Sequence, residues 1–393
     1  MQSFQPVWFG EQDFDLDAFE RECRRVTAVQ DCPFAEGIVE DIPIYSGDAL
    51  RNEFQSEARS FEVMQEFNRV FTTGAGIFAV RGGYDDIPLI DDVTSVLFSI
   101  IDEEEAGDNT SGDHFAEAGT NSRLWNSHQK LADRNPDLFI RYNANEIVHR
   151  ACQAWLGTGY QITTQVNVVR PGGRAQMVHR DYHMGIQTEA ALKCSPAGQH
   201  ATVPLLTLQG AVAHTETPIA SGPTKLLPFS QHFQPGYLAV RRPEFQAFFQ
   251  ENCVQLALNK GDLLFFNPAI FHAAGDNTTK DIQRFVNLMQ VGSIYGRTME
   301  HVDRSAMVKK VYPQLLEYVT RETMPKREIE NVIAATAEAY PFPANLDNDA
   351  PLGPSGMTPA SQQELLREAL AGGWLDSKLN AAIDAQDRLR FGG

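Results

Sequence analysis

The sequence predicts an α+β fold, with a β core of the sandwich or jelly-roll kind between helical N- and C-terminal segments. Between about residues 155 and 298, short β-branched and apolar runs alternate with glycine and proline turns. Outside these limits, the apolar residues recur at helical spacing. We expect a single domain, with a mainly helical part at 1–154, the core at 155–298 and a helical extension at 299–393.

Composition and charge narrow the classes of function. The 393-residue chain has 51 acidic and 33 basic residues and a net charge of −18, which argues against nucleic acid and anionic membrane surfaces as partners. Its five cysteines form no Cys-x-x-Cys pair, as is typical of free thiols in a reducing compartment. We see no signal peptide and no apolar run of membrane length. We expect a cytoplasmic protein that binds a small molecule.

Two helices and a loop are predicted in the N-terminal part. Apolar residues recur at three- and four-residue steps at Ile87, Ile90, Val93, Leu97 and Ile101. A second helix is predicted from about 136 to 155. The stretch 107–121 between them is rich in glycine, aspartate, asparagine and threonine, which is the composition of a loop.

The core is predicted from a series of strand-like runs. The run at 160–169 is β-branched and alternating, and a turn at 170–173 follows it. Further strands are expected at 203–213, 223–229, 253–258, 262–267, 271–274 and 283–291. Beyond Gly296 helices return, and two short ones are expected between Ser361 and Arg390. These helical flanks are candidate surfaces for a homo-oligomer.

The main chemical signal is the sequence His179-Arg180-Asp181. In a strand, residues i and i+2 share a face, which would bring an imidazole and a carboxylate together. Two histidines and one carboxylate are the ligand set of mononuclear non-haem iron(II) oxygenases. A His-x-Asp alone also fits an ordinary exposed polar pair. Strand alternation would direct Arg180 outward to an exterior salt bridge, and Tyr182 outward as well.

A second histidine and an arginine follow downstream. The strand ending near His272 and the strand from 283 are separated by the turn-like sequence at 275–281. If this hairpin is symmetric about Thr278, His272 lies opposite Arg284 and shares its face. An imidazole ligand beside a guanidinium would suit a dicarboxylate that chelates a metal with one end and meets arginine with the other. The competing interpretation of Arg284 is a surface salt bridge, which its apolar surroundings disfavour.

Together these parts resemble the phytanoyl-CoA dioxygenase family of iron(II)/2-oxoglutarate oxygenases, over about residues 165–291. The resemblance implies a cupin-like double-stranded β-helix (jelly-roll) core and a single catalytic domain. It implies iron(II) held by His179, Asp181 and His272, and 2-oxoglutarate bound by Arg284, Gln176 and Thr224. It implies no catalytic residue beyond the metal ligands.

Departures from the family pattern concern the substrate pocket. Phe229 replaces a glycine, and about 40 residues separate Asp181 from Thr224, more than the family pattern suggests. Candidate substrate contacts are Gln165, Asn167 and His183. For His183, a hydrogen bond to a neighbouring residue or plain solvation are equal alternatives.

The resemblance implies that O2 and 2-oxoglutarate are consumed, that succinate and CO2 are released, and that a small organic substrate is oxidised, by default hydroxylated. Desaturation, cyclisation and epimerisation are not distinguished from hydroxylation. No basic cluster suits the phosphates of coenzyme A, so we expect an amino acid or a secondary-metabolite intermediate, with an acyl-CoA as the alternative.

Three rival functions stay open. One is a jelly-roll binding protein with a vestigial metal site, and the second is an oxygenase that does not use 2-oxoglutarate, such as one with three histidines. The intact set of His179, Asp181, His272 and Arg284 favours the 2-oxoglutarate oxygenase over these two. The third is a structural interaction protein that uses the helical flanks as its surface, a role that can coexist with catalysis.

Overall fold

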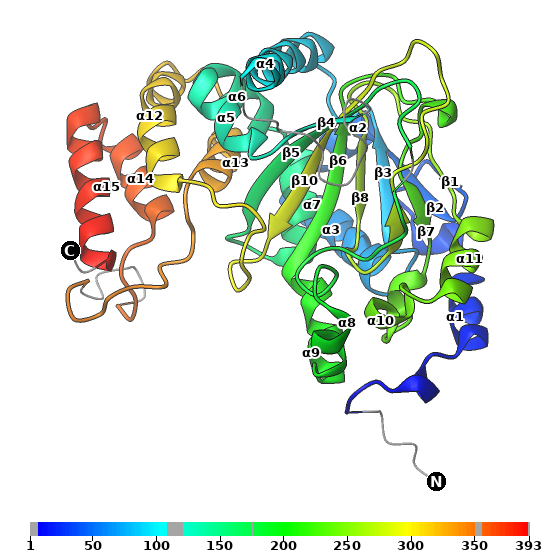
Figure 1. Ribbon diagram of the computed structural model, residues 1–393. Coiled ribbons are helices and arrows are strands. Elements are labelled where there is room, and N and C mark those ends of the chain that lie inside the picture. Colours follow the sequence, from blue (N-terminus) through cyan, green and yellow to red (C-terminus); the bar gives the residue numbers. More distant parts are fainter. Residues whose placement is uncertain (1–6, 108–120, 175, 350–355, 392–393) are drawn as a thin grey trace.

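The centre of the molecule is a mixed β-sheet. The computed structural model describes residues 7–107, 121–174, 176–349 and 356–391. Its strands are β1 (Gly37–Val39), β2 (Ile42–Ser46), β3 (Ile77–Arg81), β4 (Asn121–Leu124), β5 (Gln161–Val169), β6 (Thr207–Ala213), β7 (Lys225–Leu227), β8 (Leu263–Phe266), β9 (Phe271–Ala273) and β10 (Arg284–Gly292). Eight of them form one sheet in the order β1-β2-β3-β8-β6-β10-β5-β4, and β7 pairs with β9 in a second, small sheet (Figure 1).

Helices precede, interrupt and follow the strands. The N-terminal helices are α1 (Leu16–Cys23), α2 (Gly47–Glu53), α3 (Glu57–Thr72), α4 (Ile87–Ala106), α5 (Ser127–Arg134), α6 (Pro136–Asn143) and α7 (Glu146–Leu156). Those within the core are α8 (Glu189–Lys193), α9 (Ala197–Thr202), α10 (Gly236–Ala239) and α11 (Pro243–Asn252). The C-terminal helices are α12 (Arg304–Thr320), α13 (Lys326–Thr336), α14 (Gln362–Ala371) and α15 (Asp376–Phe391).

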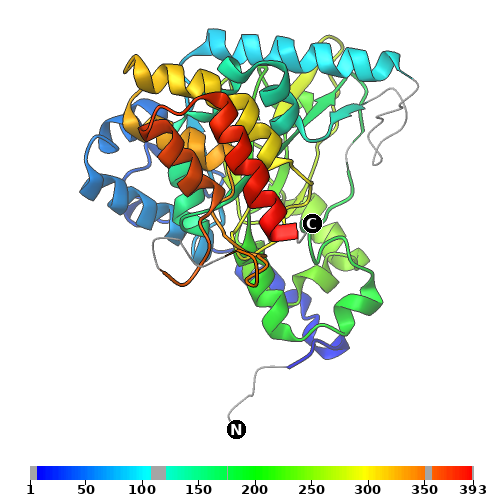
Figure 2. The ribbon, with the colours of Figure 1, turned by 90° about the vertical axis from the view of Figure 1, so that its left-hand side faces the viewer.

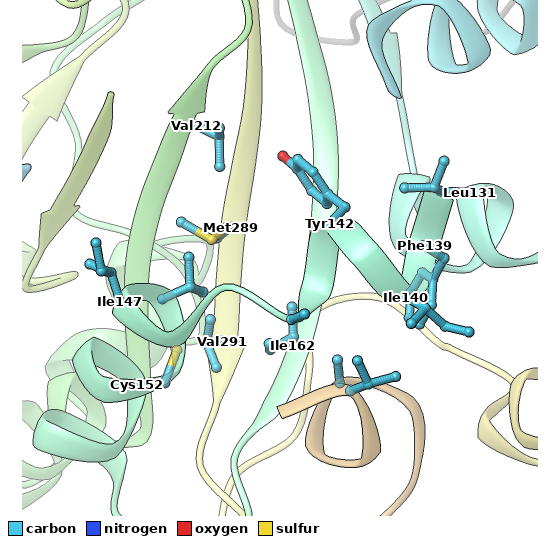
Figure 3. Packing of buried hydrophobic residues seen from close by; sticks show 14 of the residues in the cluster. Leu131, Phe139, Ile140, Tyr142, Ile147, Cys152, Ile162, Val212, Met289 and Val291 are labelled. Atoms are coloured by element: carbon cyan, nitrogen blue, oxygen red, sulfur yellow. The ribbon is translucent and has the colours of Figure 1, made fainter. Parts of the chain in front are cut away.

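The two faces of the large sheet are covered differently. One face packs against the helices in a large apolar cluster, part of which Figure 3 shows, with Met289 and Val291 of β10 near Ile147 and Cys152 of α7. The other face turns toward the small sheet, with a smaller apolar cluster between them. Because both faces are covered, nearly every residue of β5 is buried. This arrangement confirms the predicted α+β fold with flanking helices.

The N-terminal part contributes more strand than the sequence indicated. β1, β2 and β3 extend one side of the sheet, where β3 pairs with β8, and β4 forms the other edge beside β5. The expectation that residues 1–154 are mainly helical therefore misses four strands. They are three to five residues long, too short to show a periodicity of their own.

The predicted N-terminal helices are confirmed in part. α4 buries Ile90, Val93, Leu97 and Ile101 as expected. The helix expected at 136–155 is instead two helices, α6 and α7. Asn145 breaks it, because its side chain accepts a hydrogen bond from the Val148 N–H, at 3.2 Å, and caps a new helix. Of the predicted loop at 107–121, residues 108–120 lie outside the described residues.

Most predicted core strands are present, and two are not as expected. Residues 203–206 form a 3-10 turn before β6, and 253–258 make only single backbone bridges, Val254 with Leu226 and Leu258 with Thr217. At the C-terminus, α14 and α15 confirm the two short helices. Figure 1 places α12 to α15 on the side of the molecule away from the small sheet, and Figure 2 views them from that side. No helix in the described part is long and apolar enough to cross a membrane.

Candidate metal centre and its cavity

A cavity of about 780 Å³ lies between the large sheet and the small one. Its floor is one face of β5, β6, β8 and β10, and residues 176–186 together with β9 form the opposite wall. Side chains alternate along a strand, so every second residue of each floor strand faces this space. On β10 these are Arg284, Val286, Leu288 and Gln290.

Three potential metal ligands meet on the wall of this cavity. The backbones of His179 and His272 form an antiparallel bridge, with N–H···O distances of 3.0 and 3.1 Å. Asp181 follows two residues after His179. The ligand atoms of the three side chains lie within 4.8 Å of one another. Within the part of the chain that the structure describes, this is the one group of His, Cys, Asp or Glu residues placed closely enough to hold a metal ion. The predicted ligand set is therefore brought together.

Backbone carbonyls fix the tautomers of both histidines. His179 Nδ1 lies 2.8 Å from the Met177 carbonyl oxygen, and His272 Nδ1 lies 2.9 Å from that of Ile270. A carbonyl oxygen only accepts, so each Nδ1 carries the proton and each Nε2 keeps a lone pair. Both Nε2 atoms face the Asp181 carboxylate, at 3.7 and 3.6 Å. Three acceptors directed at one point are suited to a divalent metal.

Electrostatics favour the forms that bind metal. Burial, followed by the neighbouring His272, lowers the pKa of His179, so this imidazole is neutral at neutral pH. Burial raises the pKa of Asp181, but the two histidines and a hydrogen bond from Gln209 outweigh it and hold the pKa below its usual range. Neutral imidazoles and an ionised carboxylate are the protonation states that metal binding requires.

Arg180 does not face outward as predicted. Its side chain is buried and donates hydrogen bonds to the carbonyl oxygens of Ser230, at 2.6 Å, and Phe233, at 2.9 Å. The guanidinium also lies 5.2 Å from the ring centroids of Tyr237 and Phe271. Burial lowers its pKa to about 10. The expected exterior salt bridge is wrong, because the segment from 228 to 240 covers this side of the chain.

The chain leaves the extended conformation just after Asp181, and this changes the next two predictions. His183 has φ of +57°, and no strand continues past Asp181. Tyr182 therefore lines the cavity instead of pointing outward. His183 is not among the residues that line it, so its predicted place at the substrate is not supported by the geometry.

Arg284 reaches the cavity by a different route from the one predicted. β9 pairs with β7, and β10 pairs with β5 and β6, so His272 lies opposite Leu226 and not opposite Arg284. The hairpin prediction is wrong. Arg284 and His272 nevertheless line the same cavity, because they lie on sheets that face each other. Burial, with a smaller effect of the positive charge of Arg123, lowers the pKa of Arg284 to about 10.

The other predicted contact residues surround the same space. Gln176, Thr224, Gln165 and Asn167 all line the cavity. Asn167 accepts a hydrogen bond of 3.3 Å from Arg284 Nη2. Gln176 and Thr224 lie on the wall opposite β5, on either side of the small sheet.

Sequence reasoning missed two cavity residues, Arg123 and Gln209. Arg123 of β4 donates to Gln165 Oε1 at 2.5 Å, and its guanidinium lies 5.1 Å from the ring of Trp125. Gln209 of β6 donates through Nε2 to Asp181. β4 is four residues long and Gln209 stands in a run without a motif, so neither offered a pattern.

Comparisons with known proteins agree with this geometry. The sequence pattern of the family "Phytanoyl-CoA dioxygenase (PhyH)" matches residues 49–285. The chain belongs to this family. A curated relative, the iron/alpha-ketoglutarate-dependent dioxygenase ausU of Aspergillus calidoustus, is 30% identical over 142 residues, which are 34% of this chain. The match spans 40% of the length of that relative.

Solved structures with a similar arrangement come from nogalamycin biosynthesis. The non-haem alpha-ketoglutarate-dependent epimerase SnoN is 15% identical, with a TM-score of 0.41 over 59% of this chain and 82% of its own. The carbocyclase SnoK is 16% identical, with a TM-score of 0.42 over 60% of this chain and 86% of its own. The chain thus combines the sequence pattern of the phytanoyl-CoA dioxygenase family with a His-Asp-His cluster of the kind that holds iron(II).

Proposed function

We propose that the enzyme oxidises, by hydroxylation, a mainly apolar small molecule of secondary metabolism, with release of succinate and CO2. One observation carries the proposal: the His-Asp-His cluster opens into a cavity of about 780 Å³, most of whose lining surface is apolar. Ligand sites of this kind commonly combine apolar walls with a few polar groups that fix orientation.

The residue roles follow from position and charge. His179, Asp181 and His272 would hold iron(II), which supplies the oxygen chemistry when it is bound with 2-oxoglutarate. The guanidinium of Arg284 lies at the start of β10, on the floor opposite the cluster, and would bind the far carboxylate of the co-substrate. Gln176 would add a hydrogen bond there.

Two further residues support this placement of the co-substrate. Arg123 lies near enough to Arg284 to lower its pKa, so two guanidinium groups lie at this end of the cavity, which suits a dicarboxylate. Thr224 also lines the cavity and offers a hydroxyl. We propose it as a lesser contact.

The substrate would enter past an apolar rim. Met177 and Ile186 both line the cavity, yet they are 74% and 69% exposed. Trp125 and Met299 line the cavity as well. Exposed apolar side chains at a cavity are typical of a ligand contact. They suit an apolar skeleton better than a free amino acid or the phosphates of coenzyme A.

A substrate screen tests the proposal. Iron(II)-loaded enzyme would be given 2-oxoglutarate and three matched panels: polycyclic terpenoid or polyketide compounds, free amino acids and acyl-CoA thioesters. Succinate release coupled to a product 16 mass units heavier is expected in the first panel. Coupled turnover of amino acids or acyl-CoA thioesters, with the first panel inactive, would contradict the proposed substrate class.

A further inference from the structure

Gln209 lies in the middle of the cavity floor and faces the His-Asp-His cluster on the opposite wall. It lies on β6, paired with Phe266 of β8 on one side and with Gln290 of β10 on the other. The side chain is buried, 3% exposed, and its amide Nε2 donates to the Asp181 carboxylate. A residue of the large sheet thus contacts a ligand on the opposite wall.

The histidine tautomers make this hydrogen bond more important. Both histidines keep a lone pair on Nε2, so neither has a proton on that atom to donate to Asp181. The backbone N–H of Asp181 donates to the Pro268 carbonyl. Within the described part of the chain, Gln209 is therefore the side chain whose N–H holds the carboxylate while both histidines serve as ligands.

Chemistry also fixes which way the Gln209 amide points. An ionised carboxylate only accepts hydrogen bonds, so the NH2 group and not the amide oxygen must face Asp181. A carboxylate with one oxygen held by a donor cannot rotate freely about its last bond. The hydrogen bond also withdraws electron density from the carboxylate, which makes it a weaker donor to a metal.

We propose that Gln209 is a positioning residue for the iron site: its amide holds the Asp181 carboxylate in the ligating orientation and reduces its donor strength. The inference depends on the proposed role of Asp181 as an iron ligand. Groups that hydrogen-bond to metal ligands commonly contribute about tenfold to a hundredfold to metal affinity. Gln209 would therefore act on iron affinity and on the electronic structure of the centre.

Gln290 provides a matched control for this proposal. It lies directly opposite Gln209 on the neighbouring strand, lines the same cavity and is similarly buried, 7% exposed. It makes no side-chain hydrogen bond to Asp181 in the described structure. Replacing either glutamine by methionine keeps the length of the side chain and removes the amide. Only the change at residue 209 would remove the contact with Asp181.

The experiment compares Gln209→Met, Gln290→Met and wild type as full-length protein. Iron(II) would be titrated anaerobically, and the visible charge-transfer band would be recorded after addition of 2-oxoglutarate. Thermal unfolding of each metal-free protein would confirm that it is folded. Gln209→Asn, whose amide is one methylene too short to reach, serves as a second variant if the first does not fold.

For both residue 209 variants we expect iron(II) affinity to fall about tenfold to a hundredfold. The band should move to longer wavelength, because an unrestrained carboxylate donates more strongly and raises the energy of the iron electrons. Gln290→Met should match wild type in both measurements. Wild-type affinity and an unmoved band in the residue 209 variants would overturn the positioning role, as would an equal change in Gln290→Met. Absence of the band from wild type would instead count against the proposed function.

Discussion

His179 and His272 are joined by a pair of backbone hydrogen bonds, of 3.0 and 3.1 Å, that link the segment before Asp181 to β9. Their ring centroids lie 4.4 Å apart. The main chain therefore fixes the positions of the two histidines relative to each other. Each imidazole ring is also oriented by a hydrogen bond from its Nδ1 to a carbonyl oxygen.

Arg284→Met should weaken 2-oxoglutarate binding without loss of iron. Hydrogen bonds to charged groups contribute about 1.5–3 kcal/mol, which corresponds to about tenfold to a hundredfold in affinity. Arg284→Lys keeps the charge but lacks the two-pronged geometry, so we expect an intermediate affinity. Anaerobic titration of the iron-loaded variants with 2-oxoglutarate measures the effect. Unchanged affinity in Arg284→Met would exclude Arg284 as the anchor.

Arg180→Met should destabilise the fold. The substitution removes two hydrogen bonds from a charged donor, to the carbonyl oxygens of Ser230 and Phe233, and such bonds contribute about 1.5–3 kcal/mol each. Each carbonyl oxygen keeps one backbone donor, from Phe233 and Gly236 respectively, so the loss is smaller than for an unsatisfied group. Part of this loss is offset because a buried charge is no longer desolvated. We expect a net fall of about 2 kcal/mol in the free energy of unfolding, measured by urea denaturation. Arg24→Met, at an exposed ion pair with Glu20, is the control and should have almost no effect.

Glu300 should make stability depend on pH. Burial raises its pKa from 4.5 to about 7, against the opposing effects of the Asn126 N–H and of the charges of Lys130 and Arg123. The folded state then holds the proton more tightly than the unfolded state, so stability falls as pH rises from about 4.5 to 7. Gln cannot ionise. The melting temperature of Glu300→Gln relative to wild type should therefore increase between pH 5 and about pH 8. A difference that stays constant with pH would contradict this.

Local patterns in the sequence were sufficient to find the three residues of the His-Asp-His cluster, but not the topology that brings them together. The His-x-Asp pair, the later histidine and the arginine could be recognised from residue type and order. The hairpin could not, because its loop folds elsewhere: Asn277 exchanges backbone hydrogen bonds of 2.9 Å with Gly172 and Gly173. That contact leaves β10 free to pair with β5 and β6.

The other features that the sequence did not predict correctly also depend on tertiary structure. β1 and β2 form a short hairpin, and β3 and β4 pair with strands that lie far away in the sequence. All four strands are too short for a local periodicity to mark them. Arg123 reaches the cavity only through the pairing of β4 with β5, and Gln209 only through that of β6 with β8 and β10. Arg180 was placed by strand alternation, and tertiary packing of the segment from 228 to 240 overrode it. The cytoplasmic location and the homo-oligomer stay predictions.

The most direct test of the account is an anaerobic titration of the metal-free protein with iron(II) and then 2-oxoglutarate, followed by visible absorption, with Asp181→Ala and Arg284→Ala alongside. We predict a weak charge-transfer band in wild type that is lost in Asp181→Ala and requires much more 2-oxoglutarate in Arg284→Ala. Iron bound normally by wild type with no band on addition of 2-oxoglutarate would contradict the proposed iron and 2-oxoglutarate site.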